Sequence, residues 1–266
     1  MHFRNIYMKK VLIIGYGDIG QRVSRLLPEH QIIGVSRNNN TQDHNTSWHQ
    51  WDWLSGRSLE LPNVEISTVI VILKPTSFDE KGYQTGYLKA AEIIIKNLNH
   101  SFDYQKLVVV SSTRVYGEKN GRGITETAAP QPDDFRGHII LEYEQIMRDQ
   151  SKVEPLILRP SGLYDPKQKW MQKFINSFEA EQYSLSSKES NRFDRNILAT
   201  IISNYVAQKK LAELSGIFIC SEPSKIFSEL FAEQYPDKNF EDFFIASDHS
   251  GKSFNFQKLI ASNLMG

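Results

Sequence analysis

The chain has 266 residues, of which 40% are apolar and 11% aromatic, enough to bury the core of one compound domain or two closely joined lobes. Lysine plus arginine and aspartate plus glutamate each number 31, which excludes an overall charge that would attract nucleic acid or an anionic membrane. The single cysteine, Cys220, excludes an internal disulfide and a multi-cysteine metal site, and is typical of a reducing cytoplasm.

The N-terminal segment Met1–Lys10 is short and basic and lacks the apolar centre of a secretory signal. No apolar run approaches the roughly 20 residues that cross a bilayer. We therefore expect a cytoplasmic protein with neither membrane nor nucleic acid among its partners.

The first elements form a strand–helix–strand unit. The apolar spacing predicts a strand over Lys10–Ile14, a helix over Asp18–Leu27 and a second strand over Gln31–Ser36. The residues expected on the buried face of the helix are Ile19, Val23 and Leu26.

The turn between the first strand and the helix contains three glycines spaced G-x-G-x-x-G, in the stretch VLIIGYGDIG. In a dinucleotide-binding fold, Gly15 allows the tight turn, Gly17 lets the backbone approach a diphosphate, and Gly20 lets the helix pack closely on the sheet. The helix N-terminus would hold the phosphates. The alternative is a glycine turn with a structural role only. The remaining residues predicted to contact the cofactor here are Tyr16, Asp18 and Ile19.

The second strand ends in GVSRNNN, without the carboxylate that binds the ribose 2′-hydroxyl of NAD. Ser36 and Arg37 occupy this place, and a hydroxyl with a guanidinium suits a 2′-phosphate. NADP is therefore favoured over NAD, unless Arg37 is an ordinary solvated surface residue.

The middle of the chain continues the alternation. We predict a short strand around Trp48–Trp53, whose three alternating tryptophans would cover a sheet edge and the adenine side of a cleft. A strand over Ser67–Leu73, a helix over Gly82–Asn99 and a strand over Lys106–Ser112 follow. The unbroken apolar strands indicate a parallel sheet covered on both faces.

A helix over Phe135–Gln150 and a strand over Glu154–Pro160 complete the predicted core. The later predicted elements are helices over Trp170–Ala180, Asn196–Gln208, Ser224–Gln234 and Asn255–Asn263 and a strand over Gly216–Cys220. We expect an α/β fold: a Rossmann-type doubly wound parallel sheet, with residues 1–160 as the NAD(P)-binding core. Residues 161–266 would form mostly a C-terminal substrate lobe, with some segments returning to the core.

Two further segments carry a family resemblance. Ser111–Gly117 (SSTRVYG) resembles the S-S-x-x-V-Y-G segment of the extended short-chain dehydrogenases/reductases, which include nucleotide-sugar epimerases and dehydratases. Leu156–Pro166 (LILRPSGLYDP) resembles the L-R-P-x-x-x-Y-G-P segment of that family, with Asp165 in place of glycine.

The resemblance implies roles for several residues. Ser112 would hydrogen-bond the reacting oxygen of the substrate, and Thr113 would contact the substrate. Asp52 would lie near the adenine ring, or it simply caps a turn. The other residues that would contact the cofactor are Leu73, Lys74, Pro75, Ser111 and Pro160. The alternative for Pro160 is that it simply ends a strand.

The chain departs from the family at its catalytic pair. The family carries Tyr-x-x-x-Lys on the helix after V-Y-G, where the tyrosine transfers a proton and the lysine binds ribose. Alignment of DDFRGHIILEYEQI puts Arg136 at the tyrosine position and Ile140 at the lysine position. Arginine, with a pKa above about 12, is no proton donor at neutral pH. Arg136 would instead bind or polarise the substrate.

Four other residues are candidates to replace the tyrosine. Tyr143 lies two helical turns beyond Arg136, and His138 should point elsewhere on the helix. Tyr116 and Tyr164 are interpreted as structural. None is assigned as the proton donor.

This combination resembles an atypical branch of the family, the NAD(P)-binding epimerase/dehydratase-like proteins. The segment NRFDRNILATII resembles that branch's N-R-I-H-V-D-D-L-A, and Arg192 within it would meet an anionic group of the substrate or pack at the surface. The resemblance also implies a homodimer. No metal-binding motif is present. Two functions remain open: an NAD(P)-dependent oxidoreductase or epimerase/dehydratase acting on a small polar substrate, or an inactive NADP(H) sensor.

Overall fold

A seven-stranded parallel sheet forms the centre of the molecule, in the strand order β10-β6-β5-β4-β1-β2-β3. The computed structural model describes residues 10–38, 44–61, 64–118, 121–168, 189–211, 214–237 and 251–266. The strands of this sheet are β1 (Lys10–Ile14), β2 (Gln31–Ser36), β3 (Thr46–Gln50), β4 (Ile66–Ile72), β5 (Lys106–Val110), β6 (Leu156–Pro160) and β10 (Gly216–Cys220).

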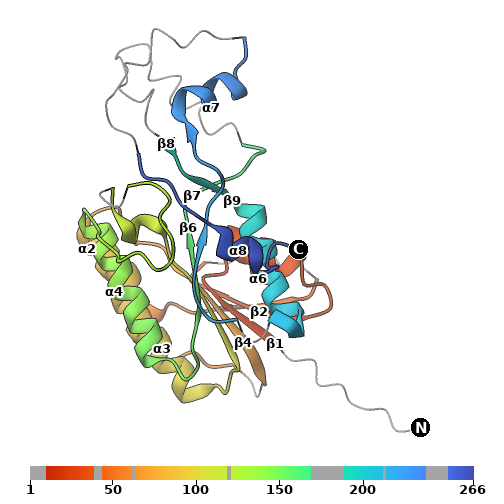
Figure 1. Cartoon of the computed structure of the whole chain (residues 1–266). Coiled ribbons are helices and arrows are strands. Elements are labelled where there is room, and N and C mark those ends of the chain that lie inside the picture. The colour runs from red at the N-terminus through yellow and green to blue at the C-terminus, as the bar shows by residue number, and fades with distance from the viewer. Residues whose placement is uncertain are drawn as a thin grey trace.

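Helices cover both faces of this sheet, and its central strands are buried on both sides, whereas the edge strand β3 is partly exposed (Figure 1). On β1, Val11 and Ile13 join one core cluster and Leu12 joins the other, as the two-residue period of a strand requires. The first cluster includes α1 (Asp18–Arg25) and α6 (Arg195–Ala207), and the second includes α3 (Ala90–Ser101) and α4 (Phe135–Gln150). The predicted parallel, doubly covered sheet is confirmed.

The order of the strands reverses at β1, because β2 lies on one side of it and β4 on the other. In open parallel sheets, ligands bind in the crevice beyond the carboxyl ends of the strands at such a reversal. The fold therefore directs attention to the turns that follow β1 and β4.

Most predicted elements of the core are present, with small differences at their ends. Helix α1 ends at Arg25 rather than Leu27. The expected face is wrong at Leu26, which is the C-cap and 48% exposed, while Leu27 turns into the core and is 2% exposed. The chain has already left the helical path at this point, so helical spacing no longer applies.

The helix predicted over Gly82–Asn99 is divided into three pieces. It consists of α2 (Glu80–Tyr83), the π-helical segment η2 (Gln84–Lys89) and α3. A Cβ atom at Gly86 would lie 2.5 Å from the carbonyl oxygen of Lys74, so this wider segment packs directly on the chain that leaves β4.

The strand predicted over Trp48–Trp53 ends early, because β3 stops at Gln50 and the 3-10 turn η1 (Trp53–Ser55) follows. Trp51 and Trp53 are buried and meet edge to face, with ring centroids 5.9 Å apart. Their alternation in the sequence therefore does not reflect a strand.

The C-terminal part of the chain builds small sheets above the carboxyl edge of the main sheet (Figure 1). Here β7 (Gly162–Tyr164) pairs with β9 (Arg192–Asp194), and β8 (Glu189–Ser190) pairs with β11 (Lys225–Ile226) ahead of α7 (Phe227–Gln234). Helices α6 and α8 (Gln257–Ala261) and strand β10 pack in the core instead. The helix predicted over Trp170–Ala180 lies outside the described residues.

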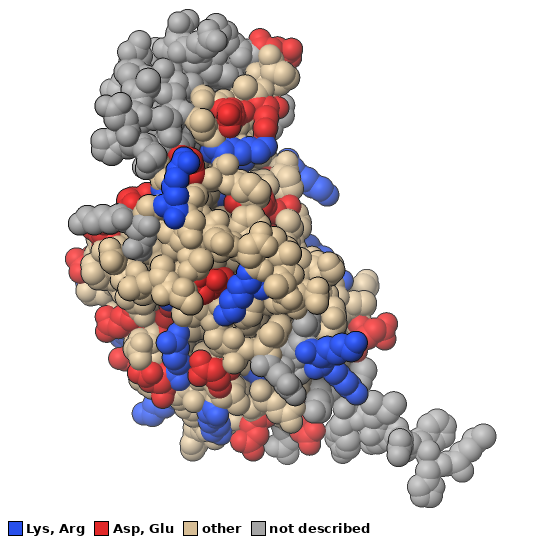
Figure 2. Space-filling view, viewed as in Figure 1, with Lys and Arg blue, Asp and Glu red and all other residues tan. Residues whose placement is uncertain are grey.

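Charged side chains of both signs are interspersed over the face displayed in Figure 2, in keeping with the balanced composition. Within the described residues, the helices are all too short or too polar to traverse a bilayer.

Candidate functional site

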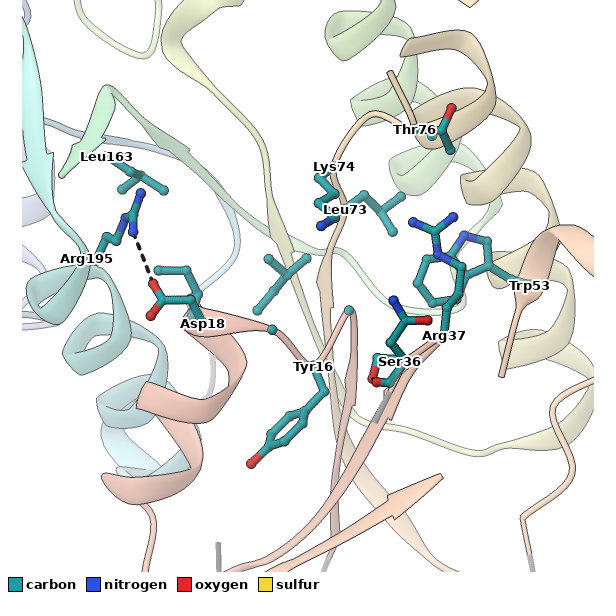
Figure 3. A pocket seen from close by; sticks show the side chains of 16 residues that line it. Tyr16, Asp18, Ser36, Arg37, Trp53, Leu73, Lys74, Thr76, Leu163 and Arg195 are labelled. Carbon is teal, nitrogen blue, oxygen red and sulfur yellow. Dashed lines mark hydrogen bonds and ion pairs between the residues drawn. The ribbon is translucent and has the colours of Figure 1, made fainter. Parts of the chain in front are cut away.

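A cavity of about 500 Å³ opens beyond the carboxyl ends of β1, β2 and β4, at the reversal of strand order, and we call it the glycine cavity (Figure 3). It is lined by Gly15, Tyr16, Gly17, Asp18, Ile19, Ser36, Arg37, Asn38, Trp53, Ile72, Leu73, Lys74, Thr76, Gly86, Leu163 and Arg195.

The three glycines of the turn have different structural roles. Gly15 has φ of +86°, and a Cβ atom there would lie 1.9 Å from the carbonyl oxygen of Ile72, so any other residue would strain the turn and displace backbone. At Gly20 a Cβ would crowd the Tyr16 ring at 3.1 Å, which brings α1 close to the sheet. At Gly17 the nearest atom to a Cβ would be 3.9 Å away, so a larger side chain would extend into open space at the cavity wall.

Tyr16 contributes backbone to the cavity, because its side chain points away from it (Figure 3). The ring covers Gly34, where a Cβ would lie 2.6 Å from a ring atom. The hydroxyl lies 2.9 Å from Ser24 Oγ and 3.3 Å from Thr46 Oγ1 in the core. This buried anchor fixes the turn.

The N-terminus of α1 faces the cavity without a capping side chain, because its N-cap is Gly17. The first-turn amides of an α-helix have no carbonyl partner within the helix. Together with the positive end of the helix dipole, such amides form a site for an anion.

The far end of the glycine cavity is built by Ser36, Arg37 and Trp53. The Ser36 hydroxyl donates to Asn38 O and accepts from Trp48 Nε1, both at 2.8 Å. The Arg37 guanidinium carbon lies 5.9 Å from the centroid of the Trp53 ring, within reach of a cation–π contact. Asp52 is absent from the lining: it is exposed and caps η1 by accepting from Leu54 N at 3.2 Å.

The charges lining the glycine cavity favour an anionic ligand. Arg37, Lys74 and Arg195 stand against one carboxylate, Asp18, among the described lining residues. Asp18 Oδ2 lies 3.5 Å from Arg195 Nη1 across the cavity mouth, as the dashed line in Figure 3 shows.

A second cavity of about 540 Å³ adjoins the first beyond β5 and β6, and we call it the serine cavity. Four apolar residues line both cavities: Ile19, Ile72, Leu73 and Leu163. The other lining residues are Tyr87, Val110, Ser111, Ser112, Thr113, Arg114, Gly117, Glu118, Asp133, Asp134, Pro160, Ser161, Gly162, Glu189, Asn191 and Lys252.

Ser112 lies where β5 gives way to the 3-10 turn η3 (Thr113–Tyr116). Its Oγ accepts from Arg114 N at 3.2 Å, which leaves the hydroxyl proton for another acceptor. Thr113 is buried and its hydroxyl donates to Pro160 O at 3.4 Å.

A buried ionic network forms the floor beneath the serine cavity. Ser111 donates its hydroxyl to Glu144, and Arg159 binds both oxygens of that carboxylate, at 2.8 Å from Nε and 2.5 Å from Nη2. Arg159 Nη1 also donates to Tyr116 Oη at 2.8 Å. Arg159 and Glu144 are each 2% exposed, so the pair is desolvated and the Tyr116 hydroxyl is engaged below the cavity.

The rim of the serine cavity is acidic. Four carboxylates line it against two cations, and the cations are already paired: Arg114 with Asp134 at 3.0 Å and Lys252 with Glu118 at 3.3 Å. Although burial raises the pKa of Asp134, hydrogen bonds from Gly137 N and Arg136 lower it below its ordinary value.

One tyrosine, Tyr87 of η2, is among the described residues that line the serine cavity. Burial raises the pKa of Tyr87 to about 12, so its hydroxyl stays protonated at neutral pH. Two tyrosines that the sequence offered as candidates lie elsewhere. Tyr143 is fully buried, and Tyr164 donates to Glu222 Oε2 at 2.9 Å. Sequence reasoning missed Tyr87, because only the π-helical segment and the tertiary packing bring it to this cavity.

Several predicted site residues do not line either cavity. Arg136 turns back on its own helix and binds Asp134, with Nη2 2.6 Å from Oδ2. The Arg192 guanidinium carbon stacks 4.6 Å from the centroid of the Tyr164 ring. Ile140, at the position of the family lysine, packs in a core cluster with Val115. Also outside both linings are Gly20, Asp52 and Pro75.

The remaining predicted residues are brought together. Those lining the glycine cavity are Gly15, Tyr16, Gly17, Asp18, Ile19, Ser36, Arg37, Leu73 and Lys74. Those lining the serine cavity alone are Ser111, Ser112, Thr113 and Pro160. Arg195 was missed: it lies within the segment NRFDRNILATII, but the resemblance of that segment gave a role to Arg192 and none to Arg195. Among the described residues, no group of histidine, cysteine, aspartate and glutamate side chains could hold a metal ion.

No family model matches the sequence, and no curated protein matches it. Solved structures of similar fold nevertheless cover nearly the whole chain. MoeE5 in complex with UDP-glucose and NAD is 17% identical, with a TM-score of 0.70 over 92% of this chain and 88% of that one.

Two further structures show the same likeness. A UDP-glucuronic acid 4-epimerase from Bacillus cereus in complex with NAD is 16% identical, with a TM-score of 0.73 over 96% of this chain and 92% of that one. A proposed NAD-dependent epimerase/dehydratase from Methylobacillus flagellatus is 21% identical, with a TM-score of 0.73 over the same shares. These likenesses confirm the Rossmann-type doubly wound fold.

Proposed function

We propose that this protein binds a nicotinamide dinucleotide in the glycine cavity and uses it on a small polar substrate in the serine cavity. It would then be an NAD(P)-dependent oxidoreductase or epimerase/dehydratase of the short-chain dehydrogenase/reductase superfamily. The observation that carries the proposal is the glycine turn at the reversal of strand order, with uncapped helix amides and three cations around it. The names of the structural neighbours, which include complexes with NAD, support it.

The residues present fit such a coenzyme. The open space at Gly17 would take the diphosphate against the α1 amides, and the apolar residues common to both cavities would contact the nicotinamide ring. When bound, the coenzyme supplies hydride transfer. The protein binds it, orients it and holds the substrate beside it.

NADP is the preferred form in this proposal. Arg37 and Ser36 lie at the end of β2, and no carboxylate lines the glycine cavity there among the described residues. A guanidinium resting on the Trp53 face is free of acidic partners in the described structure, so it suits a 2′-phosphate.

In the serine cavity, Ser112 would hold the reacting oxygen, since its hydroxyl proton is available. Tyr87 would donate a second hydrogen bond to that oxygen, because its phenol keeps its proton at physiological pH. Arg136 would act through Asp134, which it holds at the cavity rim. The sequence predicted that Arg136 itself would contact the substrate, and in this proposal Arg136 has only this indirect role.

A second candidate is an inactive NADP(H) sensor, and the observation in its favour is the lost Tyr-x-x-x-Lys pair, with Arg136 and Ile140 in its place. Turnover of NADPH with a panel of sugar nucleotides and small carbonyl compounds would exclude it. Tight NADPH binding without any turnover across that panel would favour it over the enzyme.

Quenching of tryptophan fluorescence during titration with NADPH and NADH tests the proposal. We expect Gly17→Val to lose about 100-fold or more in affinity for both coenzymes, because its side chain fills the diphosphate space. Arg37→Ala should lose about 10-fold for NADPH alone. Arg57→Ala, an exposed arginine outside the cavity, is the matched control.

Equal wild-type affinity for the two coenzymes would contradict the NADP preference. Unchanged binding by Gly17→Val would contradict the glycine cavity as the coenzyme site.

A further inference from the structure

We propose that Arg195 is a ligand of the coenzyme diphosphate and that Asp18 holds its guanidinium in place until the diphosphate binds. This inference rests on the proposed function. It adds a charged binding residue from the C-terminal half of the chain to a site built, apart from Leu163, from the first 90 residues.

The start of α6 directs Arg195 toward the glycine turn. Asp194 is the N-cap of this helix, and its carboxylate accepts from Asn196 N at 2.7 Å, which fixes the first helical turn. Arg195 is the first residue of the helix and lines the glycine cavity. In Figure 3 its side chain comes from the ribbon beside α1 and points to Asp18.

The guanidinium of Arg195 has unused donors. Its contact with Asp18 is an ion pair of 3.5 Å, longer than a charged hydrogen bond, and no hydrogen bond engages it within the described structure. An arginine has five N–H donors in a planar fork that matches two phosphate oxygens. Arg195 can therefore bind a diphosphate without breaking a strong contact.

Arg22 differs from Arg195, because its donors are already occupied. It binds Asp18 at 3.0 Å, Asp165 at 2.7 Å and Asn196 at 2.5 Å. These contacts tie α1 to the start of α6, so they also set the position of Arg195 relative to the glycine turn. Arg22 is thus a structural link, and Arg195 is the cation left for a ligand.

Asp18 places a negative charge in a proposed phosphate site, because its carboxylate lies at the helix end where the diphosphate would bind. Without a ligand, a carboxylate there is favourable, since it compensates the positive helix end and pairs with Arg195. With the diphosphate bound, the carboxylate repels it. The diphosphate then replaces Asp18 as the counter-ion of Arg195.

Isothermal titration calorimetry with NADPH, ADP and adenosine tests this assignment. Arg195→Ala should weaken binding of NADPH and ADP by about 10- to 50-fold, the loss typical of a charged hydrogen-bond pair. Adenosine, which carries no phosphate, should bind the variant and the wild type equally. Asp18→Asn should strengthen NADPH and ADP binding by about 3-fold or more, because the repulsion is removed. Arg57→Ala controls for the loss of one positive charge, and thermal unfolding without ligand checks that each variant is folded.

Unchanged affinity of folded Arg195→Ala for NADPH and ADP would overturn the assignment of Arg195 and leave the proposed function standing. An equal loss for adenosine would also overturn it, since the variant would then have damaged the cavity as a whole. Weaker NADPH binding by Asp18→Asn would overturn the role of Asp18. A wild-type protein that binds neither NADPH, NADH nor ADP would instead overturn the proposed function, and this inference with it.

Discussion

The glycine cavity and the serine cavity adjoin at one edge of one sheet, yet they are built in opposite ways. The glycine cavity is lined by the glycine turn after β1 together with residues at the ends of β2 and β4, and it carries three cations against one carboxylate. The serine cavity is formed by side chains from several distant segments and carries four carboxylates against two cations. The charges of the first cavity favour an anionic group, whereas the second cavity presents individual polar side chains.

The two cavities also differ in how their charges are used. At the serine cavity Arg114 and Lys252 are each paired with a carboxylate, whereas at the glycine cavity Arg195 retains unused donors. The carboxylates at the serine cavity are largely paired as well, because Arg122 binds Glu189 and Arg136 binds Asp134.

The largest effect that we expect concerns the floor of the serine cavity. Arg159→Met leaves the Glu144 carboxylate buried without its cation, which should reduce the free energy of unfolding by about 3–5 kcal/mol. Arg114→Met breaks a partly exposed pair on the rim of the same cavity and should cost less than about 1 kcal/mol. Urea denaturation measures both. Similar losses for the two variants would contradict the distinction between a rigid floor and a solvated rim.

The next largest effect that we expect concerns Tyr87, the tyrosine that lines the serine cavity. Tyr87→Phe should lower kcat by about 100-fold once a substrate is known, the usual contribution of a positioned hydrogen-bond donor to the reacting oxygen, without weakening NADPH binding. Tyr83→Phe is the matched control, because its ring centroid lies 5.6 Å from that of Tyr87 but the residue lines neither cavity. If the two variants turn over substrate equally fast, the assignment of Tyr87 is wrong.

The smallest expected difference between two paired variants concerns the glycine turn that forms one wall of the glycine cavity. Gly15 and Gly56 both have positive φ, at +86° and +80°, so alanine at either should cost about 1–2 kcal/mol of stability. Only at Gly15 would the new Cβ also meet the Ile72 carbonyl, at 1.9 Å, whereas at Gly56 it meets nothing within 4 Å. Gly15→Ala should therefore cost about 1–3 kcal/mol more than Gly56→Ala in urea denaturation. Equal costs would show that the turn relaxes around the added methyl group.

The sequence predicted the glycine cavity well, because its geometry follows from a local rule. Residues Lys10–Ile14 and Gln31–Ser36 form strands with the predicted ends, and three glycines between them leave few backbone paths. The conformation of such a turn is determined by residues that are adjacent in the sequence, so the sequence alone is enough to predict it. The same holds for α4, whose observed bounds agree with the predicted ones.

The serine cavity was harder to predict, because its side chains meet only through tertiary packing. The alignment gave Arg136 a place at the substrate, but Asp134 two residues earlier pairs with it and keeps it off the lining. Tyr87 was overlooked because a π-helical segment cannot be distinguished from an α-helix by apolar spacing. Arg195 was overlooked because α6 approaches the glycine turn from about 180 residues further along the chain.

The four aliphatic residues common to the two cavities, Ile19, Ile72, Leu73 and Leu163, have a consequence for redox state. A nicotinamide ring seated among them exchanges hydration for hydrocarbon contacts, which favours the neutral dihydropyridine over the cationic pyridinium. The protein should accordingly hold the reduced coenzyme more tightly than the oxidised one. Because tighter binding stabilises the reduced form, the equilibrium on the protein would shift toward oxidation of an alcohol and away from reduction of a carbonyl.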